Sequence, residues 1–377
     1  MAPRYTPLAT SLPDAVPFVG PETQERTMGR AFAARLGANE SVFGPSPRAI
    51  AAMATAAADV WMYGDPEVHD LRHALAAHHG VTADHIVVGE GIDALLGYLV
   101  RLLIGPGDTV VTSDGAYPTF SFHVAGFGGI LHKVPYLGDH EDPVALLARA
   151  RETGAKLIYL ANPDNPMGTW HEAATLEQMV AALPHDTLLV LDEAYIDLAP
   201  AGTAPVIAAD HPQVIRMRTF SKGYGMAGLR VGYGIGAPGL IRAFNKIRNH
   251  FGVGRIAQAG ALAALADQAW LVQVQAQVAA ARNRIAAIAR ANGLLPLPSA
   301  TNFVAIDTRR DFVAIDTRRD GAFALRLLQE LTRAGIFIRK PFVAPQDRAI
   351  RISAGRPADL EVLAAALPGA LLRAGKG

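Results

Sequence analysis

The chain has 377 residues, of which 50% are hydrophobic and 18% charged, and its formal net charge is +1. Because one hydrophobic core rarely serves more than about 250 to 300 residues, we expect two domains. The charges are scattered, without the lysine and arginine block that binding to nucleic acid or an anionic membrane would need, and no apolar run has the length of a transmembrane span.

The N-terminal segment, residues 1 to 45, is interpreted as an arm ahead of the first domain. Its first 20 residues hold four prolines and no apolar core of signal-peptide length. The chain also has no cysteine, which excludes a disulfide framework and a thiolate nucleophile. Together these features lead us to expect a cytoplasmic protein.

Short apolar runs of strand length recur next, separated mostly by stretches of helix length. They are Ile86–Val88, Thr109–Thr112, Leu157–Leu160, Leu188–Leu191, Val214–Met217 and Val231–Ile235. Apolar strands that alternate with helices predict a mostly parallel sheet covered by helices on both faces. We assign residues 46 to 275 to this large α/β domain.

A smaller α+β domain is predicted for residues 276 to 377, entered through a connecting helix at Gln268–Asn292. Its expected elements are strands at Phe303–Ile306, Ile336–Ile338 and Ile350–Ser353 and a helix at Ala322–Ala334.

An exact tandem repeat interrupts this domain. The nine residues FVAIDTRRD occur at Phe303–Asp311 and again, unchanged, at Phe312–Asp320. A period that occurs only twice does not indicate a solenoid. We expect one copy to pair in the sheet and the other to leave it as a loop.

Polar clusters follow five of the predicted strands. They are Gly89–Asp93, Tyr117–Phe120, Asn162–Gly168, Asp192–Tyr195 and the pair Ser221 and Lys222. Ligands of open α/β sheets bind at the carboxyl ends of the strands, so these loops are expected to converge on one site.

Lys222 is one of only six lysines, and it lies in a glycine-rich turn beside basic residues that would lower its pKa toward that of a nucleophilic amine. The alternative is a solvated turn lysine. Asp192 follows an apolar strand, where a buried carboxylate needs a cationic partner such as a protonated pyridine nitrogen. Its alternative role is a helix N-cap.

The turn Gly89–Asp93 leads into an apolar helix, whose N-terminus offers free N–H groups and a positive dipole end to a phosphate. Thr219, Ser221 and Arg230 can add hydroxyls and a bidentate guanidinium to this cradle.

Taken in order, these motifs resemble the fold-type I pyridoxal-phosphate aminotransferases, and within them the histidinol-phosphate aminotransferase group. The matching segments are LGANESVFGPSP at Leu36–Pro47, NPDNPMG at Asn162–Gly168, DEAY at Asp192–Tyr195, Ser221–Lys222, AGLR at Ala227–Arg230 and RISAG at Arg351–Gly355. The resemblance implies an aspartate-aminotransferase-like fold, a pyridoxal 5'-phosphate cofactor and no metal.

The resemblance also implies roles for single residues. Lys222 would form the Schiff base (the aldimine) and transfer protons, with Asp192 on the pyridinium nitrogen, and Asn165 and Tyr195 would donate to the phenolate oxygen. Phe120 would stack on the ring, with Tyr117 as the alternative. The phosphate would be held by the following groups: the backbone N–H of Ile92 and of Asp93, and the side chains of Thr219, Ser221 and Arg230.

Other implied roles concern partners. Tyr63 would reach the cofactor phosphate of a neighbouring subunit, which implies a homodimer. Arg351, Asn302 and Asn39 would lie at the substrate. The implied reaction passes an amino group from a donor, histidinol phosphate or an aromatic amino acid, to a 2-keto acid by a ping-pong mechanism.

Three alternatives stay open. The same cofactor and fold could serve an amino-acid decarboxylase or oxidase. Gly234–Gly239 (GIGAPG) formally fits the dinucleotide pattern of an NAD-dependent oxidoreductase, although no acidic residue follows at the required spacing. His69 and His73 have the spacing of a zinc pair without an evident third ligand.

Met167 and the stretch Arg248–Arg255 depart from the family pattern, and the latter would alter the substrate pocket.

Overall fold

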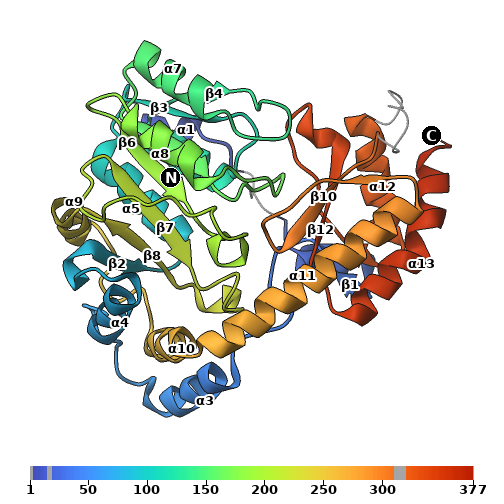
Figure 1. The fold of residues 1–377 in the computed structure, drawn as a ribbon, viewed down its shortest axis with the longest axis horizontal. Coiled ribbons are helices and arrows are strands. Elements are labelled where there is room, and N and C mark those ends of the chain that lie inside the picture. The colour runs from blue at the N-terminus through green and yellow to red at the C-terminus, as the bar shows by residue number, and fades with distance from the viewer. Residues whose placement is uncertain (1–2, 15–18, 310–319, 377) are drawn as a thin grey trace.

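The computed structural model of the chain describes residues 3–14, 19–309 and 320–376, which form two lobes joined by one long helix (Figure 1). The larger lobe holds the central sheet, and the smaller lobe holds the C-terminal strands and helices.

The central sheet has seven strands. They are β2 (Ile86–Gly89), β3 (Thr109–Ser113), β4 (Ile130–Val134), β5 (Leu157–Ala161), β6 (Leu188–Asp192), β7 (Val214–Thr219) and β8 (Gly232–Gly236). In the order β2-β8-β7-β6-β5-β3-β4, neighbours are parallel except at β8, which is antiparallel to both of its neighbours. The prediction of a mostly parallel sheet is confirmed.

The edge strand β4 escapes sequence-based prediction. Its sequence, ILHKV, places His132 and Lys133 in the middle of the strand, and only Val134 is buried. Polar residues on an edge strand discourage pairing with other molecules, and they also remove the apolar run that marks a buried strand.

Helices cover both faces of the sheet. They are α3 (Pro47–Ala56), α4 (His69–His79), α5 (Ile92–Leu103), α6 (Pro118–Gly126), α7 (Pro143–Thr153), α8 (Ala173–Ala181), α9 (Pro238–Ala243) and α10 (Arg255–Leu265). Alternate strand residues point to opposite faces, so Val110 and Tyr159 pack with α5 and α6, while Val111 and Ile158 pack with α7 and α8. Residues of β2 and β8 form a third core with α4 and α10.

The smaller lobe begins within the long helix α11 (Gln268–Ala291). Its other elements are β9 (Leu295–Pro296), β10 (Phe303–Asp307), α12 (Gly321–Arg333), β11 (Ile336–Phe337), β12 (Ala349–Ser353) and α13 (Pro357–Ala374). An antiparallel sheet of order β12-β10-β9 packs on these helices. Along α11, Leu271 packs in the large lobe and Val274 in the small one, and the domain limits at residues 45 and 275 stay a prediction.

The N-terminal arm crosses to the smaller lobe. It contains α1 (Pro7–Ser11), α2 (Pro21–Met28) and β1 (Ala34–Arg35), and β1 pairs in parallel with β11. Ala34 and Leu36 are buried in the core of the smaller lobe. The arm therefore brings the segment after Leu36 to the junction of the two lobes.

The first copy of the nine-residue repeat supplies β10, which pairs with β12. The second copy lies outside the described residues except for Asp320, whose side chain caps α12. The expected loop is therefore not tested. Within the described ranges, no helix combines the length and the apolar character needed to cross a bilayer.

Candidate active site

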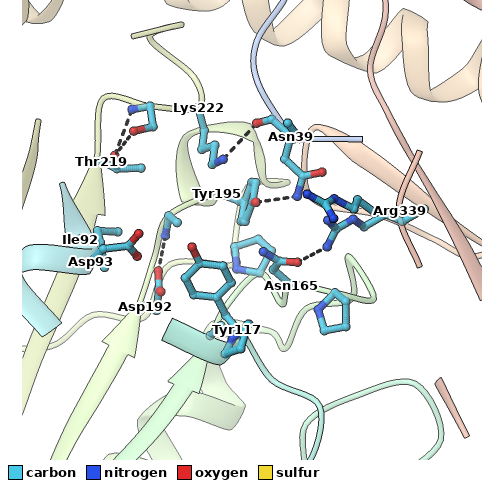
Figure 2. Close-up of a pocket in the computed structure, with 18 of the residues that line it drawn as sticks. Asn39, Ile92, Asp93, Tyr117, Asn165, Asp192, Tyr195, Thr219, Lys222 and Arg339 are labelled. Atoms are coloured by element: carbon cyan, nitrogen blue, oxygen red, sulfur yellow. Dashed lines mark hydrogen bonds between the residues drawn. The ribbon is translucent and has the colours of Figure 1, made fainter. Parts of the chain in front are cut away.

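A cavity of about 430 Å³ lies at the carboxyl ends of the sheet strands. Side chains from all five polar clusters line it, which confirms that these loops converge (Figure 2). The arm contributes residues 37–40, and the smaller lobe contributes residues 339–342 and Arg351. The cavity is therefore closed by three parts of the chain that are distant in sequence.

Lys222 points into this cavity from the turn after β7 (Figure 2). Its Nζ donates to the backbone carbonyl of Asn39 at 3.0 Å and lies 5.4 Å from the centre of the Tyr195 ring. Burial, reinforced by the charge of Arg351, lowers the pKa of Lys222 to about 8. An amine with such a pKa is neutral in a substantial fraction of molecules near neutral pH, as a nucleophile and a proton-transfer group require.

Asp192 ends β6 on the floor of the cavity and is only 5% exposed. Its Oδ2 accepts from the Tyr159 hydroxyl at 2.7 Å, and its Oδ1 accepts from the backbone N–H of Ala194 at 2.9 Å. Burial raises its pKa to about 6, because no cation forms an ion pair with it in the described part of the chain. A protonated ring nitrogen would supply the missing charge, so this carboxylate fits a pyridine cofactor.

Hydroxyl groups, a guanidinium and a helix N-terminus gather at one end of the cavity. Thr219 Oγ1 lies 3.0 Å from Ser221 Oγ, to which Arg230 Nη1 donates at 3.4 Å. Helix α5 starts at the same place, so the N–H groups of its first turn face the cavity mouth beside Ile92 and Asp93. The hydroxyls, guanidinium and helix terminus together suit a phosphate ester.

Gly91, which precedes α5, has a backbone conformation that a residue with a side chain would adopt only under strain. Its φ is +85°, and a Cβ atom would come within 2.4 Å of Arg230 Nη2. Arg230 itself adopts a left-handed conformation with φ of +56°. Such backbone strain in a non-glycine residue is typical of ligand sites, and it holds the guanidinium over the helix terminus.

A second cationic region lies at the side of the smaller lobe. Arg351 is on β12, and its Nη1 donates to Asn165 Oδ1. Arg339, whose backbone pairs with that of Arg351, also lines the cavity (Figure 2). Neither arginine makes an ion pair with a carboxylate among the described residues, and Arg351 Nε is buried without a hydrogen-bond partner. A buried, unpaired guanidinium is costly unless an anion binds there.

Asn39 connects these regions. Its Nδ2 donates to the Tyr195 hydroxyl at 3.0 Å, and its Oδ1 accepts from Ser353 Oγ at 3.0 Å. Burial raises the pKa of Tyr195 to about 12, which keeps its hydroxyl protonated and able to donate. Tyr195 and Asn165 thus present polar groups to the centre of the cavity, as expected for partners of a phenolate oxygen.

The expectation for the stacking residue is corrected. Phe120 does not line the cavity, because it is fully buried and stacks on Tyr159 with ring centres 4.7 Å apart. Phe120 lies in the first turn of helix α6 (Pro118–Gly126), on the side that packs in the core, whereas Tyr117 precedes the helix in a non-helical backbone conformation. Tyr117, just before the helix, lines the cavity instead.

Asn302 is also corrected. It is fully buried outside the cavity lining, and its Nδ2 donates to the carbonyl of Asn39 at 2.9 Å and to that of Glu40 at 3.3 Å. Asn302 therefore positions the arm and has no direct access to a substrate in this cavity.

Tyr63 and the stretch Arg248–Arg255 lie away from the cavity of their own chain. Tyr63 is 81% exposed, its ring lies 4.9 Å from that of Phe251, and its carbonyl accepts from Arg255 Nη2 at 2.8 Å. The expected effect of this stretch on the substrate pocket is thus absent within a single chain.

Two cavity residues escape sequence reasoning. Tyr159 lies inside an apolar strand, where its hydroxyl gives no sign of facing Asp192. Arg339 directly follows the predicted strand at residues 336–338, and this position at a strand end could have marked it as a residue of the cavity. The glycines of the dinucleotide-like pattern, Gly234 and Gly236, are paired inside β8 and form no phosphate-binding turn.

Comparisons with known proteins agree with this geometry. The family model described as aminotransferase class I and II matches residues 34–367. A histidinol-phosphate aminotransferase of Anaeromyxobacter sp. (strain Fw109-5) is 37% identical over 302 residues, 79% of this chain and 82% of that protein. An aromatic amino acid aminotransferase of Corynebacterium diphtheriae is 38% identical over 257 residues, 67% and 75% of the two chains.

The fold agrees as well. The crystal structure of histidinol-phosphate aminotransferase from Sinorhizobium meliloti in complex with pyridoxal-5'-phosphate superposes with a TM-score of 0.93 and 52% identity, covering 99% of both chains. An aspartate aminotransferase of Thermus thermophilus, bound to maleate, has a TM-score of 0.77 at 23% identity, with 92% of this chain and 93% of that chain covered. The second likeness supports the fold alone.

Proposed function

The chain belongs to the aminotransferase class I and II family and is a pyridoxal-phosphate-dependent transaminase, and on this premise we propose that its amino donor is histidinol phosphate and its acceptor a 2-keto acid. The observation that carries the proposal is the pair of arginines, Arg339 and Arg351, at the end of the cavity opposite the cofactor phosphate cradle. The names of the most similar relatives agree with this choice of donor.

A phosphate monoester carries nearly two negative charges at neutral pH, and planar guanidinium groups bind phosphate oxygens in bidentate fashion. Arg351 offers its Nη groups and its unpartnered Nε, and Arg339 offers a second guanidinium beside it. The carboxylate of a 2-keto acid can bind Arg351 in the other half of the reaction. One anion site can thus serve a donor without a carboxylate and an acceptor with one.

Bound pyridoxal phosphate supplies an electron-accepting ring that makes the proton on the amino-bearing carbon acidic. Asp192 would keep the ring nitrogen protonated, and Tyr117 would lie against the ring. Tyr195 and Asn165 would donate to the ring oxygen and hold the ring in register with Lys222. The neutral amine of Lys222 would then accept the proton from one carbon and return it to another.

We also propose that the active enzyme is a homodimer in which Tyr63 reaches the partner's cofactor phosphate. Tyr63 is a large aromatic residue that is 81% exposed, and it lies beside the exposed Phe251. Large aromatic residues in such a setting are typical of protein interfaces.

An aromatic amino acid is the second candidate donor, because a relative carries that name and the exposed ring of Phe342 lines the cavity mouth. Its carboxylate would use Arg351 alone, so Arg339 distinguishes the two donors. The test compares histidinol phosphate, histidinol and phenylalanine in single-turnover reactions that follow the absorbance of the bound cofactor.

For a histidinol phosphate enzyme, removing the phosphate from the donor should lower kcat/KM by at least about 100-fold, as should Arg339→Gln with the intact donor. Phenylalanine should react poorly with the wild type. Faster turnover of phenylalanine than of histidinol phosphate, unaffected by Arg339→Gln, would assign the enzyme to aromatic amino acids.

A further inference from the structure

Two buried carboxylates lie outside the set of residues that line the cavity. Asp164 and Glu141 are each 2% exposed, and neither forms an ion pair among the described residues. Asp164 belongs to the loop after β5, and Glu141 lies just ahead of α7. Buried acids without a cationic partner require a specific explanation.

Glu141 joins the ends of two sheet strands. Its Oε2 accepts from Ser113 Oγ at 2.6 Å, and its Oε1 accepts from the backbone N–H of Ala161 at 2.9 Å. Ser113 is the last residue of β3, and Ala161 is the last residue of β5 and lines the cavity. Glu141 is thus fixed directly below the cavity.

Asp164 accepts hydrogen bonds at both of its carboxylate oxygens. Its Oδ1 accepts from the Tyr136 hydroxyl at 3.0 Å, and its Oδ2 accepts from the backbone N–H of Met167 at 2.9 Å. The next residue, Asn165, accepts from Arg351. Met167 is fully buried against Ala305 of β10 and Ala349 of β12, so the loop also contacts the smaller lobe.

The charges around the two acids are mostly negative. Burial raises the pKa of both acids, and the negative charge of Asp164 raises the pKa of Glu141 further. Asp192 acts on Glu141 in the same direction, while Asp114 acts on the neighbouring Tyr136.

Two side chains counteract the rise in the pKa of Asp164. Tyr136 donates to Asp164, and Arg351 is the cation whose charge lowers the pKa of Asp164, which still lies at about 7. His171 faces the backbone carbonyl of Glu141 at 2.8 Å with a ring whose pKa is lowered by burial, so it adds no positive charge near neutral pH.

We propose that Asp164 takes up a proton from solvent when an anionic group of the substrate binds Arg351, whose guanidinium donates to the neighbouring residue Asn165. Asp164 is then a positioning residue. In the open site its negative charge partly balances Arg351. In the occupied site the ligand provides that charge, and protonation of Asp164 removes the repulsion between Asp164 and the bound anion. The inference rests on Arg351 as the anion site of the proposed function.

The sign follows from linkage. A bound anion cancels the field of Arg351 at Asp164, which raises the pKa of Asp164 above its value in the open site. Anion affinity should therefore be highest below pH 7. It should fall as the pH rises from the pKa of Asp164 in the open site to its higher pKa in the occupied site. If anion binding raises the pKa of Asp164 by about one unit, the affinity for the anion should fall about tenfold over this pH interval. Binding at pH 7.5 should then be accompanied by uptake of about half a proton.

The test uses the holoenzyme and inorganic sulfate, whose charge does not change between pH 6 and 9. Sulfate binding is measured by titration calorimetry in two buffers of different ionisation enthalpy, which gives the number of protons taken up. Wild type should take up about half a proton more than Asp164→Asn at pH 7.5. The variant should also lose up to about tenfold less affinity between pH 6 and 9 than wild type does.

Two further variants separate this role from a structural one. Tyr136→Phe removes a donor to the ionised acid and should move the pH dependence of sulfate affinity to higher pH. Arg351→Gln should abolish sulfate binding, and its failure to do so would refute the anion site itself. Equal proton uptake in wild type and Asp164→Asn, or affinity curves that stay parallel at all pH values, would overturn the proposal even if Arg351 binds sulfate. Neither the sulfate affinity nor the proton uptake depends on which amino donor the enzyme uses.

Discussion

Replacing Asp192 by asparagine should make the cofactor-free protein more stable against unfolding. The same change should weaken cofactor binding and lower turnover. The carboxylate has a pKa of about 6 in the folded chain, against 3.8 for the free side chain. The difference of about two pH units corresponds to about 3 kcal/mol of folding free energy. Because the folded pKa is raised, this stability is present below pH 3.8 and is lost as the pH rises through 6. Asparagine does not ionise and avoids the loss.

When the cofactor is bound, the aspartate is favoured over asparagine. A carboxylate and a pyridinium about 4 Å apart attract each other by about 4 kcal/mol at an effective dielectric constant of 20. We therefore expect Asp192→Asn to weaken cofactor binding by roughly 2 to 4 kcal/mol, or about 30-fold to 1000-fold, and to lower turnover. Cofactor affinity follows from absorbance titration of the cofactor-free protein, and stability follows from urea unfolding of the same protein at pH 5 and 7.5.

Asp197 provides a matched control. Burial raises the pKa of this carboxyl to about 6 as well, yet Asp197 does not line the cavity. Asp197→Asn should stabilise the protein at pH 7.5 and leave cofactor affinity unchanged. If Asp192→Asn fails to stabilise the cofactor-free protein, or binds cofactor as tightly as wild type, the reasoning about this carboxylate is refuted.

Three further predictions test the site and the assembly. Lys222→Ala should lose the visible absorbance band of the bound cofactor and all turnover in a spectrophotometric assay, and retained activity would contradict its role. Tyr117→Ala should weaken cofactor binding with little effect on folding, whereas Phe120→Ala should cost about 3 to 5 kcal/mol in urea unfolding; the reverse pattern would restore Phe120 as the stacking residue. Tyr63→Phe should lower cofactor affinity several-fold in absorbance titration, and unchanged affinity would contradict its reach into a partner subunit.

Much of the fold follows from the sequence because the sheet is buried on both faces. Runs such as Leu157–Leu160 and Leu188–Leu191 are apolar throughout, and this continuity identifies them as central parallel strands. The direction of β8 is different. Its sequence, GYGIG, carries no sign of strand direction, and its antiparallel direction follows from the connection to β7 through residues 220–231, which contains no crossover α-helix.

The site was predictable where a residue's place in a strand or turn determines its direction. Asp192 at the end of β6 and Lys222 in the turn after β7 had to reach the carboxyl edge of the sheet. Phe120 was mispredicted because the sequence does not show where helix α6 begins: Phe120 lies in its first turn and packs on Tyr159, whereas Tyr117 precedes the helix in a non-helical conformation. Tyr159 and Asp164 depend on contacts between distant segments, which sequence spacing does not reveal.

The proposed role of Lys222 requires a covalent bond between the cofactor aldehyde and this one of the six lysines. Borohydride reduction of the holoenzyme would make that bond permanent, and peptide mass mapping would locate it. We expect the modification on Lys222 alone, at one cofactor per chain. Modification of any other lysine instead, or none at all in an active preparation, would contradict it.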